Sequence, residues 1–316
     1  MSIKKDYVLS VVVGTLNRPD LLRKCIESIL SNTSIPVKIY VTDAGSTDET
    51  IDYLRGIASD EIIVTLHTKK LGQAKAYNEI FSILNTPYVC WLSDDNVIVD
   101  HGLEKAVRIL DGNPLIGMVG LKVRDVQGPF SSAPYIGGMS ETGILNVNQG
   151  VLRTEILQRL GGFSEDFMDY GIDPDLTTRV LYAGHDIVYT KDVAIFHWRD
   201  WGESEVFRAQ LAKQERYKAL YREKYLRDGS QGCPSLFKIR IVGGIKYVLT
   251  KLSKLLGCAK AECWARDWYN IILGHYISLF DPIRCLSKEF HLLQHCDRET
   301  VEYYAKEINN HAICNQ

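Results

Sequence analysis

The chain has 316 residues, 46% hydrophobic and 24% charged, an ordinary globular composition that allows one large domain with an appendage or two domains. A net charge of −2 excludes general electrostatic attraction to nucleic acid, so no partner of that class is expected. We expect a cytoplasmic protein without a membrane span, because the sequence has no run of about 18 apolar residues and no signal-peptide core, and its eight cysteines form no CxxC pair.

Strand and helix patterns alternate along the first hundred residues. Apolar, mostly β-branched runs predict buried strands at 8–16, 37–42, 61–67 and 88–92. Apolar spacings of three and four predict helices at 21–30, just after Pro19, and at 51–57 and 74–84, with Ser46 or Thr47 able to cap the second. This alternation predicts a mostly parallel, Rossmann-like sheet with helices on both faces, the α/β class.

The following hundred residues contain further helices and strands around one long irregular segment. Residues 124–148 are rich in glycine and proline and predict a functional loop with short antiparallel strands. The remaining predicted elements are helices at 103–110, 150–161 and 176–183 and strands at 116–123, 186–189 and 194–196. We therefore expect one domain at 1–204, with halves at about 1–100 and 101–204, and a helical extension at 205–316.

Polar side chains follow three of the predicted strands where each strand ends. These are Thr15-Asn17-Arg18, Asp43 with Gly45-Ser46, and the adjacent carboxylates Asp94-Asp95. Because the carboxyl ends of parallel strands meet at one edge of a sheet, these groups should line one crevice. Asp94-Asp95 has two interpretations: a solvated turn whose side chain caps the next helix, or a Mg²⁺ or Mn²⁺ site for a nucleotide diphosphate.

The chain resembles the GT-A fold glycosyltransferases of family 2 over roughly residues 8–204. The likeness is carried by six segments in the order of that family, ending with two acid-rich ones. They are Val11–Arg18, Thr42–Thr50, Gly72–Asn78, Leu92–Asn96, Gly161–Phe167 and Asp173–Leu176.

The resemblance implies roles for individual residues. It implies a nucleotide pocket lined by Thr15, Asn17, Arg18, Asp43, Gly72, Lys75 and Asp94. It also implies that Asp95 and His197 bind Mn²⁺ or Mg²⁺, although a lone histidine after a strand is more often structural.

Asp173 resembles the catalytic base of the family. It would take the proton from an acceptor hydroxyl in an inverting transfer, while the metal stabilises the leaving nucleoside diphosphate. Asp166, Asp169 and Asp175 are rivals in the same loop, and Asp175 could instead cap a helix that begins at Leu176. The sequence departs from the family pattern at Ile172, where a glutamate commonly precedes the base, and at Ala44, where an acid or amide is common.

The expected function is metal-assisted, inverting transfer of a sugar from a UDP- or dTDP-sugar to a hydroxyl of a glycan or a lipid-linked acceptor. A sugar nucleotidyltransferase is one alternative, but Thr15–Arg18 lacks the glycine-rich, basic loop that a triphosphate requires. A catalytically inactive carbohydrate-binding protein of the same fold is the other alternative.

Residues 236–261 contain six basic residues and no acid, interleaved with leucine, isoleucine and valine. This pattern is typical of a basic amphipathic helix that either packs on the main domain or lies on the anionic inner face of the cell membrane. The sequence is also compatible with a homo-oligomer. A zinc site from Cys258 and Cys263, or from His291, His295 and Cys296, is a weak alternative because the spacing matches no strong pattern.

Overall fold

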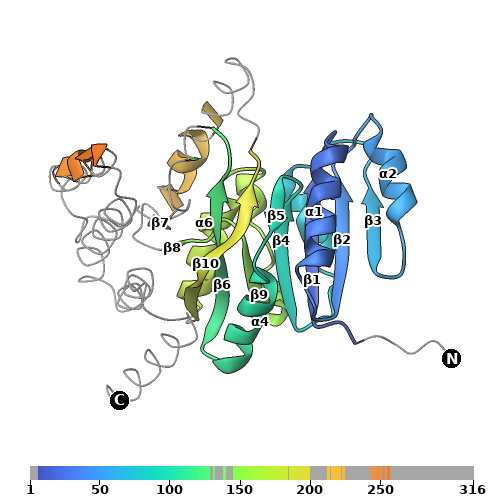
Figure 1. Ribbon diagram of the computed structural model, residues 1–316, viewed down its shortest axis with the longest axis horizontal. Helices are drawn as coiled ribbons and strands as arrows, with labels where there is room; N and C mark the ends of the chain where they lie inside the picture. The colour runs from blue at the N-terminus through green and yellow to red at the C-terminus, as the bar shows by residue number, and fades with distance from the viewer. Residues whose placement is uncertain are drawn as a thin grey trace.

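The computed structural model describes residues 6–128, 131, 138–139, 145–183 and 185–199, together with parts of 212–224 and of 241–256. Within these ranges the chain forms an α/β domain built on one mixed sheet (Figure 1). The zinc alternatives, from residue 258 onward, lie outside the described residues, as does most of the predicted helical extension.

The sheet has eight strands in the order β3-β2-β1-β4-β9-β6-β10-β5. Strands β3, β2, β1 and β4 are parallel neighbours, whereas β9 is antiparallel to β4 and β6, and β5 is antiparallel to β10. The strands are β1 (Leu9–Thr15), β2 (Val37–Asp43), β3 (Ile62–Leu66), β4 (Tyr88–Ser93), β5 (Asn96–Ile98), β6 (Ile116–Asp125), β9 (Gly150–Arg153) and β10 (Asp186–His197). Strands β7 (Gly138–Met139) and β8 (Leu145–Asn146) pair separately.

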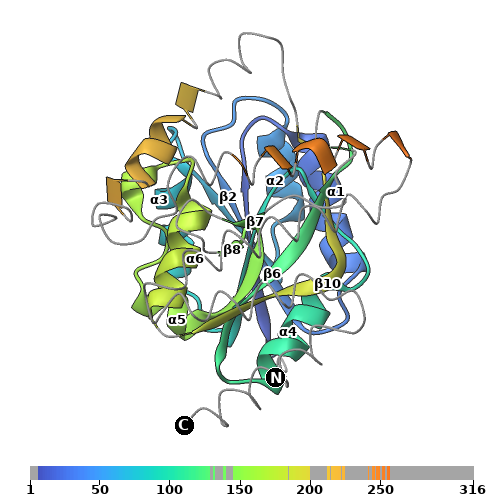
Figure 2. The same ribbon diagram turned by 90° about the vertical axis from the view of Figure 1, so that its left-hand side faces the viewer.

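Helices cover both faces of this sheet, as the sequence predicts. Helices α1, α2 and α4 lie on one face, and α3, α5 and α6 lie on the other (Figure 2). Their bounds are α1 (Pro19–Ser31), α2 (Thr50–Ile57), α3 (Gln73–Phe81), α4 (Gly102–Gly112), α5 (Thr154–Arg159) and α6 (Ile172–Tyr182), with a short 3₁₀ turn, η1, at Glu165–Phe167.

Three local predictions are wrong. The helix predicted over 150–161 is divided: Gly150–Arg153 is strand β9, because buried Val151 and Leu152 fill the sheet between β4 and β6, and only Thr154–Arg159 is helical. The separate strands at 186–189 and 194–196 form one strand, β10, interrupted by bulges. Ser46 and Thr47 do not cap α2, since the cap is Glu49 and the hydroxyl of Ser46 instead bonds Asp43 and Asn17.

A buried tyrosine joins β1 and β4 just before these two strands end. The buried Tyr77 on α3 accepts a hydrogen bond from Gly14 N at 2.9 Å and donates one to the carbonyl of Leu92. A Cβ at residue 14 would lie only 2.7 Å from the Tyr77 hydroxyl, so glycine is required for this approach. The register pairs Gly14 with Ser93, which places the next residues, Thr15 and Asp94, side by side.

A helical segment within 212–224 packs against the acid-rich loop after α5. Tyr217 and Tyr221 lie against Phe167, each with ring centroids 6.4 Å away, and the Tyr221 hydroxyl is 2.6 Å from that of Thr178. Among the described residues, no helix is long and apolar enough to cross a membrane. The cysteines of the described ranges, Cys25 and Cys90, are buried free thiols.

Candidate active site

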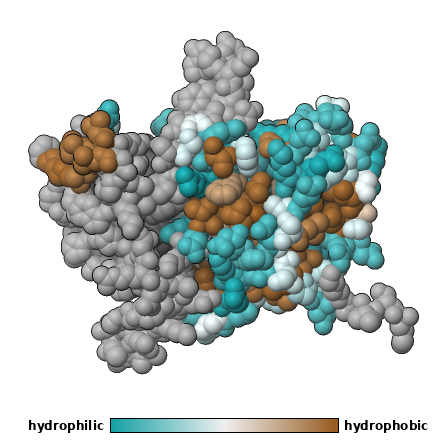
Figure 3. Space-filling model, in the orientation of Figure 1, coloured by the Kyte–Doolittle hydropathy of each residue, from teal (hydrophilic) through white to brown (hydrophobic). Residues whose placement is uncertain are grey.

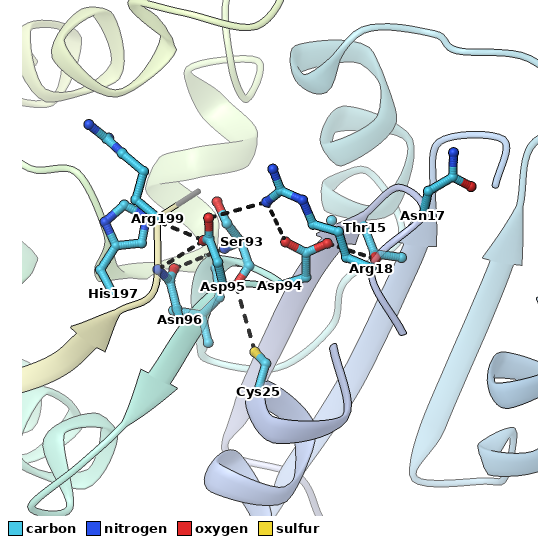
Figure 4. Close-up of polar contacts among 12 residues, drawn as sticks. Thr15, Asn17, Arg18, Cys25, Ser93, Asp94, Asp95, Asn96, His197 and Arg199 are labelled. Carbon is cyan, nitrogen blue, oxygen red and sulfur yellow. Dashed lines mark hydrogen bonds and ion pairs between the residues drawn. The ribbon is translucent and has the colours of Figure 1, made fainter. Parts of the chain in front are cut away.

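Two adjacent carboxylates at the end of β4 form the centre of the site (Figure 4). Asp94 and Asp95 are both buried. Thr15 Oγ1 donates to Asp94 Oδ2 at 2.8 Å, and Arg18 NH1 lies 3.2 Å from Asp94 Oδ1 and 3.3 Å from Asp95 Oδ2. The predicted convergence of the β1 and β4 ends is therefore confirmed, and the guanidinium of Arg18 bridges the two acids.

The interpretation of Asp94-Asp95 as a helix-capping turn is wrong, because the chain continues into strand β5. The turn is closed by Asn96, whose Oδ1 accepts a hydrogen bond from Ser93 N at 2.9 Å. Since the neighbouring amide performs this structural duty, the burial of two carboxylates needs another explanation.

His197, at the end of β10, lies between two carboxylates. Its Nδ1 is 2.8 Å from Asp125 Oδ1, and its Nε2 is 3.3 Å from Asp95 Oδ1. The backbone fixes this approach as well, since Trp198 N donates to the carbonyl of Asp95 at 2.8 Å. A carboxylate bonded to one ring nitrogen is the arrangement that orients metal-binding histidines, and here it turns Nε2 toward Asp95.

Burial and neighbouring charges separate the two acids in their protonation. Burial, together with the charge of Asp95, raises the pKa of Asp94 to about 6. Burial also acts to raise the pKa of Asp95, but the hydrogen bond and charge of His197, with the charge of Arg18, outweigh it and hold that pKa below its ordinary value. Asp95 is therefore the carboxylate that remains ionised in mildly acidic conditions.

Asp173 lies in the first turn of α6, beside the end of β4. Its Oδ1 accepts a hydrogen bond from the indole Nε1 of Trp91 at 3.2 Å, and the same N–H also points to the carbonyl of Asn148 at 3.0 Å. Burial raises the pKa of Asp173 to about 7, although the Trp91 hydrogen bond and the Arg199 charge oppose this.

The rival acids of this loop have structural partners. Asp169 accepts from Gln73 N at 2.9 Å, at the start of α3, and pairs with Lys213. Asp175 pairs with Arg179 at 2.7 Å and with Lys224 at 2.8 Å. Because α6 already begins at Ile172, the expectation that Asp175 caps a helix at Leu176 is wrong. Asp166 is exposed on the 3₁₀ turn.

The other residues predicted to bind nucleotide lie on neighbouring loops. Asp43 accepts hydrogen bonds from Gly45 N at 3.0 Å and Ser46 N at 2.9 Å, so its carboxylate shapes the loop after β2. Asn17 has a left-handed backbone, with φ of 53°, and its Oδ1 accepts from Thr47 N at 2.8 Å, which joins this loop to the one after β1. Gly72, with φ of 87°, precedes α3.

Lys75 is the predicted residue that the structure does not bring into this group. Its side chain is exposed on α3, and no contact with another predicted site residue is found within the described ranges.

Asp125 and Trp91 are site residues that the sequence analysis missed. Asp125 ends β6, and the rule that identified the other clusters, a polar group where a buried strand ends, applies to it too. The described part of the chain leaves its buried Oδ2 without a hydrogen-bond partner. Trp91 lies within strand β4, and a tryptophan in an apolar run is normally interpreted as a residue of the hydrophobic core.

The donor set suits a hard divalent ion, but no complete site is preformed. Two carboxylates and an imidazole are groups that bind Mn²⁺ or Mg²⁺. Across the described residues, no three His, Cys, Asp or Glu side chains already surround a common point as metal ligands. Such ions are commonly held by one or two carboxylates together with substrate phosphates, so the residues present fit an ion that arrives with its nucleotide.

Curated relatives of the chain include two with named glycosyl-transfer activities. One is the UDP-Glc:alpha-D-GlcNAc-diphosphoundecaprenol beta-1,3-glucosyltransferase WfaP of Escherichia coli, 26% identical over 33% of this chain and 41% of the relative. The other is the O-antigen chain rhamnosyltransferase RfbN of Salmonella typhimurium, 20% identical over 63% and 69%. Three further relatives are matched over only 35%, 16% and 17% of their own length.

A solved structure has a similar fold, and a family model matches part of the sequence. The mannosyltransferase PcManGT from Pyrobaculum calidifontis, in complex with GDP-Man and Mn²⁺, superposes with a TM-score of 0.55 at 17% identity, covering 97% of this chain and 88% of that one. At this identity the likeness shows the GT-A fold alone. The model of glycosyl transferase family 2 matches residues 10–168, about half of the chain. The chain therefore belongs to glycosyl transferase family 2.

Proposed function

We propose that the protein is an inverting, metal-assisted glycosyltransferase that uses Asp173 as its base. Asp173 is the partly buried acid of its loop whose pKa is raised and which contacts Trp91 of β4, whereas Asp169 and Asp175 are held in ion pairs. A base with a pKa near 7 is matched to proton abstraction at neutral pH. This observation carries the proposal, and it favours transfer over the inactive alternative.

We further propose the groups that hold the donor. Asp95 and His197 would hold Mn²⁺ or Mg²⁺, and that ion, when bound, would neutralise the leaving diphosphate. Thr15, Asn17, Arg18, Asp43, Gly72 and Asp94 would contact the nucleotide, and Lys75, which is exposed on α3, is kept as a further candidate. A UDP-sugar and a lipid-linked acceptor are supported by the name of the E. coli relative.

The proposal is tested by screening the purified chain with nucleotides, nucleotide sugars and Mn²⁺ or Mg²⁺ for thermal stabilisation. A nucleotide that stabilises only with a metal identifies the donor class, since a ligand at 100 times its Kd adds about 2.7 kcal/mol. Absence of stabilisation by any pair, and of transfer from any nucleotide sugar, would favour an inactive carbohydrate-binding protein.

Replacing Asp125 with asparagine is expected to weaken Mn²⁺-dependent UDP binding about 10-fold, the lower range for partners of a metal-binding histidine. The cause is loss of the charge that orients His197 from 2.8 Å. Calorimetry with UDP and Mn²⁺ measures the change. Asp192→Asn, on the exposed side of the same strand β10, is the matched control. Equal affinities of the two variants would show that Asp125 has no role in metal binding.

We also propose that the segment 236–261 contacts an anionic membrane surface. Ile241, Ile245, Val248, Leu252, Leu255 and Leu256 follow helical spacing, and 43–81% of each residue is exposed. They form an apolar group apart from the domain (Figure 3). This exposure favours membrane contact over packing of this face on the main domain. The excess of six basic residues over no acids favours anionic lipid as the partner.

Sedimentation with vesicles tests this contact. The chain is expected to sediment with phosphatidylcholine vesicles containing phosphatidylglycerol, and less so without that lipid or at high salt. Leu255→Glu with Leu256→Glu should weaken binding at least about 10-fold, since burying each leucine contributes roughly 1.5–3 kcal/mol. Ile83→Glu, at another exposed apolar position, is the control. Self-association that the leucine changes abolish, without vesicle binding, would assign the face to a second copy instead.

The division into a domain at 1–204 and an extension at 205–316 is retained as part of this proposal. Within the described residues, the contacts of Lys213 with Asp169 and of Lys224 with Asp175 attach the start of the extension to the acid-rich loop. These contacts support an extension that borders the acceptor side of the site.

A further inference from the structure

Arg18 occupies the position that a cation would take between the two acids. A single nitrogen, NH1, contacts Asp94 Oδ1 at 3.2 Å and Asp95 Oδ2 at 3.3 Å. The side chains of the two acids are only 4% and 9% exposed, whereas that of Arg18 is 36% exposed. The guanidinium is therefore the most exposed member of this group, and Figure 4 shows its contacts with both acids.

The backbone holds Arg18 in place while leaving its side chain accessible. The residue precedes Pro19 at the start of α1, its carbonyl accepts from Leu22 N at 3.0 Å, and the left-handed Asn17 before it is tied to the loop after β2. A rotation of the Arg18 side chain is therefore the movement that would take the guanidinium away from the two acids. Because arginine does not lose its proton, it can cease to neutralise the acids only by such a movement.

We propose that Arg18 is the resident counter-cation of Asp94 and Asp95, which a divalent ion displaces and whose guanidinium then binds the diphosphate of the donor. Two buried, adjacent carboxylates need a positive partner in the empty protein, and Arg18 supplies it. With the divalent ion in place, the guanidinium is released beside the nucleotide, and guanidinium groups suit phosphate oxygens. This inference rests on the proposed metal-assisted function and adds a coupling between the two ligands.

The coupling has a signature that separates it from simpler roles. Arg18 opposes the metal in the empty protein and favours the nucleotide in the loaded one, so its removal should change the two affinities in opposite directions. A residue that only binds phosphate would affect the nucleotide alone. A residue that only supports the fold would weaken both. Reciprocity requires that the effect of metal on nucleotide equals that of nucleotide on metal.

The test is calorimetry of the full chain with Mn²⁺ alone, and with UDP in the presence of Mn²⁺. In Arg18→Gln, the affinity for Mn²⁺ alone is expected to rise about 10-fold, equivalent to about 1.4 kcal/mol, while that for UDP falls about 10-fold. Arg23→Gln is the matched control, since Arg23 lies on the same helix over the Tyr53 ring, at 4.8 Å from its centroid. It should change neither affinity.

The outcomes distinguish this inference from the function on which it rests. Unchanged or weaker Mn²⁺ binding by Arg18→Gln, with wild-type binding of Mn²⁺ and UDP intact, overturns the displacement alone. Failure of the wild-type chain to bind UDP with Mn²⁺ overturns the proposed function instead. Arg18→Lys provides a second check, because it keeps the positive charge and should leave Mn²⁺ binding closer to that of the wild type than Arg18→Gln does.

Discussion

Replacing Asp173 with asparagine is expected to lower the transfer rate about 1,000-fold, within the range that a general base contributes, while leaving donor affinity unchanged. The amide keeps the size of the carboxyl and can still accept the hydrogen bond from Trp91, whose Nε1 lies 3.2 Å from Asp173 Oδ1. It cannot take a proton from the acceptor. The measurements are kcat with the identified donor and acceptor, and the Kd of the nucleotide with Mn²⁺.

The pH dependence of the wild type should report the same group. Because burial raises the pKa of Asp173 to about 7, the rate should rise as pH passes through 7 and then level off, as the base becomes deprotonated. Asp166→Asn, at an exposed acid of the same loop, should retain both the rate and the profile. Near wild-type turnover by Asp173→Asn would reject Asp173 as the base.

The stability of this variant should change in the opposite direction to its activity. A folded-state pKa of about 7, above the ordinary value of 3.8, means that the folded protein favours the neutral acid. The contribution of neutral Asp173 to the free energy of unfolding is complete below about pH 4 and is lost as pH rises through 7. At pH 8 the wild type therefore bears a penalty of about 2 kcal/mol in its free energy of unfolding, a value already halved because Asp173 is partly exposed. Asparagine removes this penalty. Denaturant unfolding measures the gain.

The fold could be predicted where long apolar runs alternate with amphipathic helical patterns. Strands β1 to β4 and their helices have apolar periods that determine both type and position, and these predictions are confirmed. Residues 150–153 were misassigned because Val151 and Leu152 form an apolar run of only two residues that leads directly into the apolar residues of α5, so the whole segment has the pattern of one helix. Strand β5 is only three residues long, too short for any periodic pattern.

The candidate site could be predicted as far as the strand ends, but not in its pairings. Position at the end of β1 and β4 identified Thr15 and Asp94, and the structure joins them at 2.8 Å. The contact of Asp125 with His197 links residues 72 positions apart in the sequence, and that of Trp91 with Asp173 links residues 82 apart. Only the sheet order β9-β6-β10, which sequence patterns do not encode, brings such groups together.

Replacing Asp95 with alanine is expected to weaken Mn²⁺-dependent UDP binding about 100-fold or more, at least as much as losing the outer partners of a metal ligand. Asp95 is the ionised member of the acid pair, and it faces both His197 Nε2, at 3.3 Å, and the guanidinium of Arg18. Asp94→Ala should have a smaller effect, because the hydroxyl of Thr15 and Arg18 hold that carboxylate. Calorimetry with UDP, with and without Mn²⁺, compares the variants.

A control is needed because removal of Asp95 also leaves His197 and Arg18 with one partner fewer. Asp95→Asn retains the shape and the backbone contact with Trp198, so it separates loss of charge from loss of packing. Because its shape is retained, this variant should fold like the wild type. Because asparagine is a weaker metal ligand than a carboxylate, it should still lose most of the Mn²⁺ dependence of UDP binding. An unchanged affinity in both variants would place the metal elsewhere, and the burial of the acid pair would then be explained by its pairing with Arg18 and His197 alone.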